Sequence, residues 1–308
     1  MSQGVLAVEH KRMTPMDLAR KAKSGFVQLW KRYPSAAVAL VIIVIVLFGV
    51  IFAELLTPFE PNDRYGTRLG DLMEPAKAKY GDHTHILGTD QLTRDVFTRV
   101  LHGGRISLIV GLVAPTLGIA VGAMVGITGA YFGGYVDLIL QRITDTLMAI
   151  PTLVLAMAIT ITFGFNVWIV IIALAVGISP YASRLLRSHV LVIRNAQYVE
   201  ASKAMGATHL RIIFRHLVPN SWAPWIVLNA VNIGNAIVTE ASLSYLGIGI
   251  APPTSTWGNL LINVTTYWRD SPHLVLAPGL AITIVVLCSN MFGDAIRDML
   301  DPRLRGAD

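Results

Sequence analysis

Residues 198–220 read Tyr198-Val-Glu-Ala-Ser-Lys-Ala-Met-Gly-Ala-Thr-His-Leu-Arg-Ile-Ile-Phe-Arg-His-Leu-Val-Pro-Asn220, a charged stretch between two strongly apolar ones. Its second half has apolar residues at the spacing of one helix face, with two arginines on the other face. The apolar face comprises Leu210, Ile213, Phe214 and Leu217, and the arginines are Arg211 and Arg215. Gly206 permits a turn before this helix, and Pro219 is expected to stop it because proline lacks an N–H. The stretch therefore predicts two short helices joined by a glycine turn.

The chain around this stretch is far more apolar than a soluble domain. Of its 308 residues, 54% are hydrophobic and only 14% are charged, and the mean hydropathy is +0.58. Six apolar segments are long enough, or nearly so, to cross a bilayer as helices. They cover residues 36–56, 106–130, 143–163, 167–183, 222–251 and 274–293. We therefore expect an all-α, polytopic membrane protein with six transmembrane helices.

The distribution of basic residues predicts how the chain lies in the membrane. A basic leader, residues 1–35, precedes the first span and is expected to stay in the cytoplasm as an amphipathic helix or a loosely ordered segment. Residues 36–308 would form the membrane domain, with 57–105 outside the cell and 196–220 in the cytoplasm. Most of the 25 Lys and Arg residues then fall on the cytoplasmic side, where both termini are also expected.

Several functional classes are excluded or disfavoured by residues that the sequence lacks. There is no Gly-Lys dipeptide and hence no P-loop, so this chain is not expected to hydrolyse ATP. Hydrolase motifs are also absent, and the basic residues are not interleaved with aromatics as nucleic-acid binding requires. Asp82, His83, His85 and Asp90 form only a weak metal pattern, and no metal site is predicted.

The residues of the 196–220 segment closely resemble the coupling loop of ABC importer permeases. That loop has a Glu-Ala-Ala motif, a glycine shortly after it and a hydrophobic-Pro end, and this sequence differs only in its third residue, a serine. The corresponding coupling residues are Glu200, Ala201, Ser202, Gly206, His216 and Pro219. In this family the loop docks into a groove of a separate ATPase subunit and transmits its closure to the membrane helices.

Three further segments resemble the dipeptide, oligopeptide and nickel subfamily, specifically its C-type subunit. They are residues 85–108, 243–258 and 293–306, so the resemblance covers nearly all of the chain except the leader. Thr93 stands where the family usually has glycine, which leaves the backbone conformation before Arg94 open. Asp90, Arg94, Asp95 and Arg99 alternate in charge, and we favour a structural role for them over direct contact with substrate.

The resemblance implies a type I ABC importer fold and a multi-pass subunit of a bacterial or archaeal cytoplasmic (inner) membrane. It implies four kinds of partner besides the lipid bilayer: a related B-type permease, two ATP-binding subunits and an extracytoplasmic substrate-binding protein. ATP and Mg would be bound by the ATPase subunits, with no cofactor on this chain and no enzymatic activity. Di- or oligopeptides are the favoured substrates, although nickel complexes, glutathione and oligosaccharides occur in the subfamily.

Polar residues inside the fifth span are candidates for the translocation pathway. Asn232, Asn235 and Glu240 lie on a polar face of this span, and ionisable groups within membranes are costly and often functional. A packed network between helices is the alternative interpretation for Glu240. A competing functional class, an ion-coupled secondary transporter or channel, would use Glu240 as an ion site and need no ATPase.

Two features of the third and second spans suggest helix packing. Asp145 is expected to pair with Arg142 or Arg184 near the membrane edge. Gly118, Gly122 and Gly126 recur every four residues, a pattern typical of closely packed membrane helices, although isolated glycines are also common in such helices.

Overall fold

The computed structural model describes residues 33–65, 78–80, 83–262, 268–269 and 271–300. The leader, predicted for residues 1–35, therefore lies almost entirely outside the described residues. Within them the fold is nearly all helical, as predicted, and the exception is a small antiparallel hairpin of β1 (Ala78–Tyr80) and β2 (His83–His85). The long helices are α2 (Pro34–Ile51), α4 (Val96–Phe132), α7 (Val167–Ile193), α11 (Trp222–Tyr245) and α13 (His273–Leu300).

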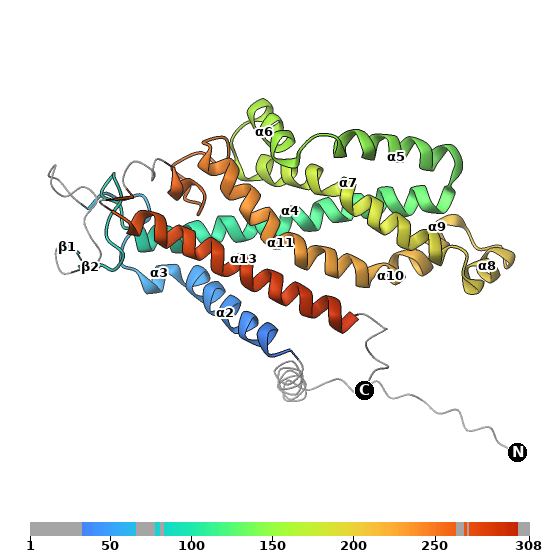
Figure 1. Cartoon of the computed structure of the whole chain (residues 1–308), viewed down its shortest axis with the longest axis horizontal. Coiled ribbons are helices and arrows are strands. Elements are labelled where there is room, and N and C mark those ends of the chain that lie inside the picture. The colour runs from blue at the N-terminus through green and yellow to red at the C-terminus, as the bar shows by residue number, and fades with distance from the viewer. Residues whose placement is uncertain (1–32, 66–77, 81–82, 263–267, 270, 301–308) are drawn as a thin grey trace, which may run out of the picture.

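These five helices are each long and apolar enough to cross a membrane, and a bent pair supplies a sixth crossing. The pair consists of α5 (Gly134–Met148) and α6 (Thr152–Phe163), which meet at an angle of 89°. In Figure 1, α5 begins beside the end of α4, and α6 leads to the start of α7, nearer the end that carries the β1–β2 hairpin. With the pair counted as one span, α2 begins and α13 ends at the same end of the bundle (Figure 1).

The span predicted over residues 143–163 is not one straight helix but the bent pair of α5 and α6. The chain is already helical from Gly134, and the helix breaks before Pro151, which has extended backbone angles of φ −54° and ψ 131°. The break has a local cause, because proline cannot donate the next helical hydrogen bond and its ring disfavours the helical conformation of the residue before it. Two ion pairs hold α5 against α7: Arg187 with Asp137, and Arg184 with Asp145 as predicted.

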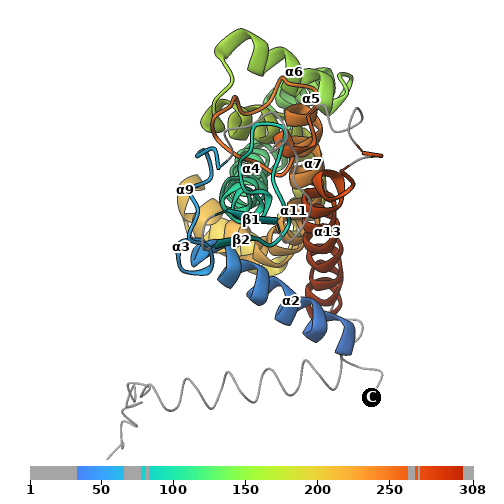
Figure 2. The same ribbon diagram turned by 90° about the vertical axis from the view of Figure 1, so that its left-hand side faces the viewer.

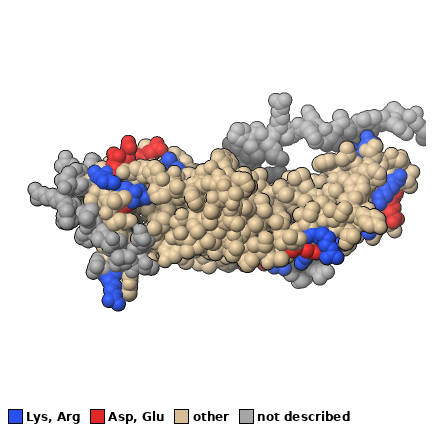
Figure 3. Space-filling view, turned by 90° about the horizontal axis from the view of Figure 1, so that it is seen from above, with Lys and Arg blue, Asp and Glu red and all other residues tan. Residues whose placement is uncertain are grey.

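Several helices are longer than the apolar segments that predicted them. α4 has 37 residues and would be about 55 Å long, which exceeds the roughly 30 Å of a hydrocarbon core. Figure 3 shows the consequence on one face of the molecule, where charged residues gather toward the two ends and leave a broad uncharged band between them. This arrangement fits a bundle that crosses a bilayer along its long axis.

The bundle is built around α4. Seen along its length in Figure 2, α4 lies at the centre, with α2 and α13 on one side and α5 and α6 on the other. The closest packing is with α7, where the predicted glycine face makes the contact. A Cβ atom added to Gly118, Gly122 or Gly126 would lie 2.3–2.6 Å from a backbone oxygen of α7. The small-residue pattern therefore does bring two helix backbones together, as predicted.

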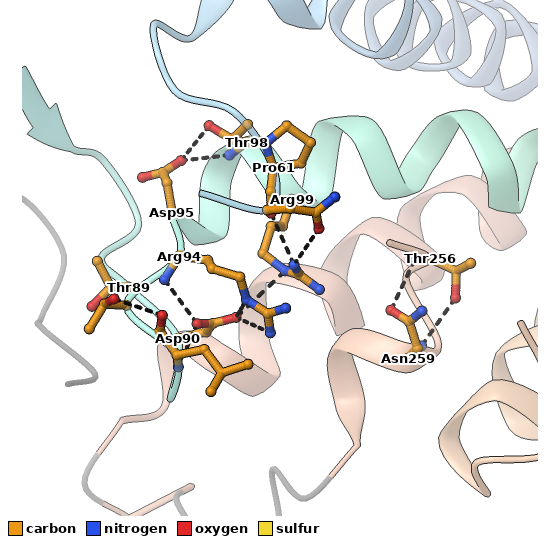
Figure 4. Close-up of polar contacts among 12 residues, drawn as sticks. Pro61, Thr89, Asp90, Arg94, Asp95, Thr98, Arg99, Thr256 and Asn259 are labelled. Atoms are coloured by element: carbon orange, nitrogen blue, oxygen red, sulfur yellow. Dashed lines mark hydrogen bonds and ion pairs between the residues drawn. The ribbon is translucent and has the colours of Figure 1, made fainter. Parts of the chain in front are cut away.

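The N-terminal end of α4 is held by a polar cluster (Figure 4). Asp90 accepts hydrogen bonds from the backbone and the guanidinium of Arg94, and Asp95 caps α4 by accepting from the backbone N–H of Thr98. Asp90, Arg94 and Asp95 precede α4, whereas Arg99 lies within it. The alternating charges of these four residues therefore do not lie along a single helix. Thr93 has a left-handed backbone with φ 59°, the conformation that glycine adopts most readily.

Candidate functional site

Residues 196–220, which resemble a coupling loop in sequence, connect α7 to α11 at the end of the molecule opposite the β1–β2 hairpin (Figure 1). It contains α8 (Gln197–Ala204), α9 (His209–Ile212), a π-helical turn η2 (Ile213–Leu217) and α10 (Val218–Asn220). We call residues 196–220 the coupling loop from here on. The two helices joined by a glycine turn agree with the sequence prediction.

Gly206 forms the turn between the two helices. Its φ of +79° lies in the left-handed region, and its N–H donates a 2.9 Å hydrogen bond to the carbonyl of Lys203. The next N–H, from Ala207, reaches back to the carbonyl of Ser202, which closes the end of α8. No atom lies within 4 Å of a Cβ placed at Gly206, so the glycine is required by the backbone conformation and not by lack of space.

The Glu-Ala-Ser motif presents two residues to the outside and one to the inside. Glu200 and Ala201 are exposed on α8, whereas Ser202 is buried. A small side chain is needed at the buried position, and serine is similar to alanine in volume. The departure from the usual motif is thus compatible with the packing of this loop.

The predicted apolar face of the second helix is only partly correct. Leu217 is buried and Ile213 is half-buried, but Leu210 and Phe214 are 67% and 68% exposed. Ile212 is buried in their place. The difference arises because the π-helical turn advances less per residue than an α-helix, so the 3.6-residue period does not hold through it.

Pro219 does not stop the helix, contrary to the prediction. The Val218 N–H donates to the carbonyl of Ile213, five residues earlier, and the chain then continues through α10 almost directly into α11. The wider π turn provides room for a proline in a segment that remains helical. Nearby, His216 is half-buried, and its ring centroid lies 5.8 Å from that of Tyr198.

Three large apolar side chains of the coupling loop, Met205, Leu210 and Phe214, are exposed, and Met205 is 82% exposed. Leu210 and Phe214 border an apolar groove of about 560 Å³ together with residues of α4 and α11. Arg211 and Arg215 are exposed beside these two residues in the sequence. Large exposed apolar side chains beside charged ones are typical of a surface that contacts another protein or the membrane. We call Met205, Leu210 and Phe214 the apolar tip.

Contacts to α4 and α7 hold the coupling loop in place. The hydroxyl of Tyr131, near the end of α4, is 2.8 Å from Nδ1 of His209, and Nζ of Lys203 lies 5.6 Å from the centre of the Tyr131 ring. On α7, His189 Nε2 is 3.1 Å from the carbonyl oxygen of Asn220. Sequence reasoning missed these contacts, because Tyr131 and His209 are 78 residues apart and nothing local marks them as a pair.

A second feature is a groove of about 360 Å³ between α6, α7 and α11. Asn232 and Asn235, both predicted to line the pathway, border it from α11. Thr239, on the same polar face of α11, also borders it, whereas sequence reasoning missed the polar residues of the other wall, Thr152 and Tyr181. We call this the polar groove.

Glu240 lies away from the polar groove and is completely buried. Its carboxylate accepts hydrogen bonds from Ser107 on α4 at 3.1 Å and from Ser244 at 2.8 Å. Ser107 in turn accepts a hydrogen bond from the backbone N–H of Trp257 in the loop after α11. The carboxylate thus joins α4, α11 and the following loop, which favours the helix-network interpretation over an ion site.

The described part of the chain contains no group of three or more His, Cys, Asp or Glu side chains placed to hold a metal ion. His85 is buried between Asp95, 2.8 Å from its Nδ1, and the stacked ring of Phe59. Asp82 and the side chain of His83 lie outside the described residues. Cys288, also described, is buried and free.

Comparison with known proteins places this architecture among transport permeases. The chain is 40% identical over 280 residues to the dipeptide transport system permease protein DppC of Escherichia coli strain K12, covering 91% of this chain and 93% of that protein. It is 39% identical to a putative peptide transport system permease protein of Brucella abortus biovar 1, covering 89% and 90%. A glutathione transport system permease protein, GsiD of Pectobacterium atrosepticum, is 35% identical over 94% of this chain and 95% of its own length.

Structural comparison supports the same fold. An inward-facing conformation of the MetNI methionine ABC transporter matches with a TM-score of 0.54 and 18% sequence identity, over 66% of this chain and 96% of the matched one. The family described as "Binding-protein-dependent transport system inner membrane component" matches residues 118–306, which include the coupling loop and the polar groove. The chain therefore belongs to the family of inner-membrane permease components of binding-protein-dependent ABC transport systems.

Proposed function

We propose that this chain is the C-type permease subunit of an ATP-driven importer for di- or oligopeptides. The observation that carries the proposal is the coupling loop, a helix–glycine–helix segment at one end of the membrane bundle with the exposed side chains of the apolar tip. The substrate class is supported by relatives at 35% to 40% identity whose names specify peptide, dipeptide and glutathione transport. All three names denote peptides, and two of them denote short ones, a dipeptide and glutathione.

The proposed complex contains a related B-type permease, two ATP-binding subunits and an extracytoplasmic substrate-binding protein. ATP and Mg belong to the ATP-binding subunits, since this sequence lacks the Gly-Lys dipeptide of a P-loop. This chain carries no cofactor and acts as a transport subunit, not an enzyme. Its coupling residues are those of the family motif, Glu200, Ala201, Ser202, Gly206, His216 and Pro219.

In the proposed topology the protein lies in the cytoplasmic membrane, with the coupling loop and both termini on the cytoplasmic side. The start of α2 and the end of α13 face the same end of the bundle, which supports the placement of both termini together (Figure 1). The excess of basic residues in the segments assigned to the cytoplasm supports the orientation. The β1–β2 hairpin and the Asp90 cluster would then face outward.

The proposed mechanism follows from how the coupling loop is attached. Closure of the ATP-binding subunits would push on the apolar tip, and the loop would transmit this displacement through the Tyr131–His209 contact to α4 and through the His189–Asn220 contact to α7. The three glycines of α4 bring its backbone into contact with that of α7, so the two helices would move as one unit. ATP can shift the transporter from one conformation to the other only if it binds one of the two conformations more tightly.

Co-purification tests the proposal. We expect wild-type protein, expressed with its native membrane partners, to retain two ATP-binding subunits and ATPase activity, and Leu210→Asp together with Phe214→Asp to lose both. Leu55→Asp is the matched control, because Leu55 is 81% exposed and belongs to α3 (Ala53–Leu56), which lies toward the opposite end of the bundle in Figure 1. Gly206→Asp should also lose the subunits, whereas Gly206→Asn should retain more of them because asparagine tolerates positive φ better. Transport by a chain that purifies alone would refute the ABC importer proposal.

A further inference from the structure

The polar groove has an unusual composition for the surface of a membrane helix bundle. Asn232, Asn235 and Thr239 follow one another at intervals of three and four residues, so they share one face of α11. Asn235 lies near the middle of this span and is exposed. An exposed amide in hydrocarbon would lack hydrogen-bond partners at a cost of several kcal/mol. This face is therefore expected to meet water or a polar ligand and not lipid.

The hydrogen-bonding groups of the groove are available to a ligand. Within the part of the chain that the structure describes, the side chains of Asn235 and Tyr181 make no hydrogen bond, and Tyr181 is 53% exposed. Thr239 donates its hydroxyl hydrogen to the carbonyl of Asn235 at 2.7 Å, which leaves the hydroxyl oxygen as an acceptor. The asparagine amide and the tyrosine hydroxyl each provide both a donor and an acceptor.

The groove wall contains no charged residue. The ionisable group of this helix, Glu240, lies on another face and is already bonded to Ser107 and Ser244. A surface of this kind binds neutral donors and acceptors and has no group to select for the charge of a ligand. The amide groups of a peptide backbone have this chemistry, and they are the same whatever side chains the peptide carries.

The spacing along α11 also matches a peptide. Asn235 and Thr239 are separated by about 6 Å along the helix axis, from a rise of 1.5 Å per residue. Two residues of an extended peptide span at most about 7 Å. A peptide lying along α11, even a dipeptide, would therefore bring backbone polar groups about two residues apart opposite these two side chains, with Tyr181 reaching it from α7.

We propose that the polar groove binds the backbone of the transported peptide, with Tyr181, Asn235 and Thr239 as the residues that recognise its amides. The inference rests on the proposed function as a peptide permease and adds to it a contact surface within the membrane. It assigns to this surface a tolerance for substrates of different charge, because recognition uses only the backbone. Glu240 has no part in substrate contact.

Uptake into proteoliposomes that contain the complete importer tests the inference. The probes are three radiolabelled dipeptides, alanyl-alanine, lysyl-alanine and aspartyl-alanine, which differ in charge but share one backbone. We expect Asn235→Ala and Tyr181→Phe each to lower uptake of all three by a similar factor, about threefold to tenfold for one hydrogen bond. Tyr135→Phe is the matched control, since Tyr135 is 84% exposed on α5 and does not border the groove.

Two additional readouts separate the groove from the rest of the transporter. Co-purified ATP-binding subunits and basal ATPase activity should be unchanged in both groove variants. Unchanged uptake in both, or a loss confined to one charged dipeptide, would overturn the inference while leaving the proposed function intact. Loss of the second permease on purification would show that this face packs against that subunit and would also overturn it. If wild-type protein took up none of the dipeptides, the proposed function itself would fail.

Discussion

Replacing Gly122 with alanine tests the close crossing of α4 and α7. A Cβ atom at this position would lie 2.4 Å from the carbonyl oxygen of Ser179 and 2.8 Å from the backbone nitrogen of Ser183, where ordinary contact begins at 3.4 Å. Both atoms belong to the backbone of α7, so no change of rotamer can relieve the overlap. The two helices must separate locally by about 1 Å, because packed interiors leave little free space.

The energetic cost follows from this geometry. Overpacking by a methyl group that forces a backbone shift costs about 1–3 kcal/mol. Gly279→Ala in α13 is the matched control, because nothing lies within 4 Å of its Cβ position. Alanine there should stabilise the helix by about 0.5–1 kcal/mol relative to glycine. The two alanine variants are therefore expected to differ in free energy of unfolding by about 2 kcal/mol or more.

Unfolding by sodium dodecyl sulfate in mixed micelles, followed by tryptophan fluorescence, would measure this difference. A double variant with Ala182→Gly adds a second test, because the Ala182 Cβ lies only 2.8 Å from the new methyl group. It should recover part of the lost stability, but not all, since the contact with Ser179 remains. Equal stability of Gly122→Ala and Gly279→Ala would refute the close crossing of the two helices.

Three other predictions concern single residues. Thr93→Gly should be more stable than Thr93→Ala by about 1 kcal/mol in the same unfolding assay, because both lose the hydroxyl but only alanine keeps the strain of φ 59°; equal stability would argue against the left-handed turn. Glu240→Gln should keep dipeptide uptake near the wild-type rate, and abolished uptake in the folded variant would show that Glu240 belongs to the translocation pathway. Glu240→Leu should lower the free energy of unfolding by about 1–3 kcal/mol, because the buried hydroxyls of Ser107 and Ser244 lose their acceptor. Tyr131→Phe should reduce the peptide transported per ATP hydrolysed, since it removes the hydrogen bond to His209, and the same ratio as in Tyr135→Phe would exclude a role in transmission.

Most of the architecture is predictable from short windows of sequence. A run of apolar residues specifies a membrane helix, because every backbone polar group in hydrocarbon must be bonded within the segment. The glycine repeat in α4 predicts close packing for an equally local reason, since three residues on one face lack side chains. The helix–glycine–helix form of the coupling loop is local as well, because Gly206 adopts a backbone conformation that other residues disfavour.

Where the sequence predictions failed, the cause was an interaction that a fixed helical period cannot represent. The helix breaks at Pro151 within the apolar run 143–163, and the π turn over Ile213–Leu217 interrupts the 3.6-residue period from which one apolar face was predicted. Both are departures of the backbone from the regular α-helix on which pattern reading depends. The domain boundaries and the roles of individual coupling residues stay predictions.

By itself the sequence determined the helical membrane fold, the position of the coupling loop and the polar character of α11. Only the tertiary structure decided how that polar character is divided, with Asn235 open to a groove beside Tyr181 and Glu240 buried against Ser107, 133 residues away along the chain. Residues on neighbouring turns of one helix look alike in sequence. Their roles differ because packing of α4, α6 and α7 against α11 encloses one face and leaves the next one open.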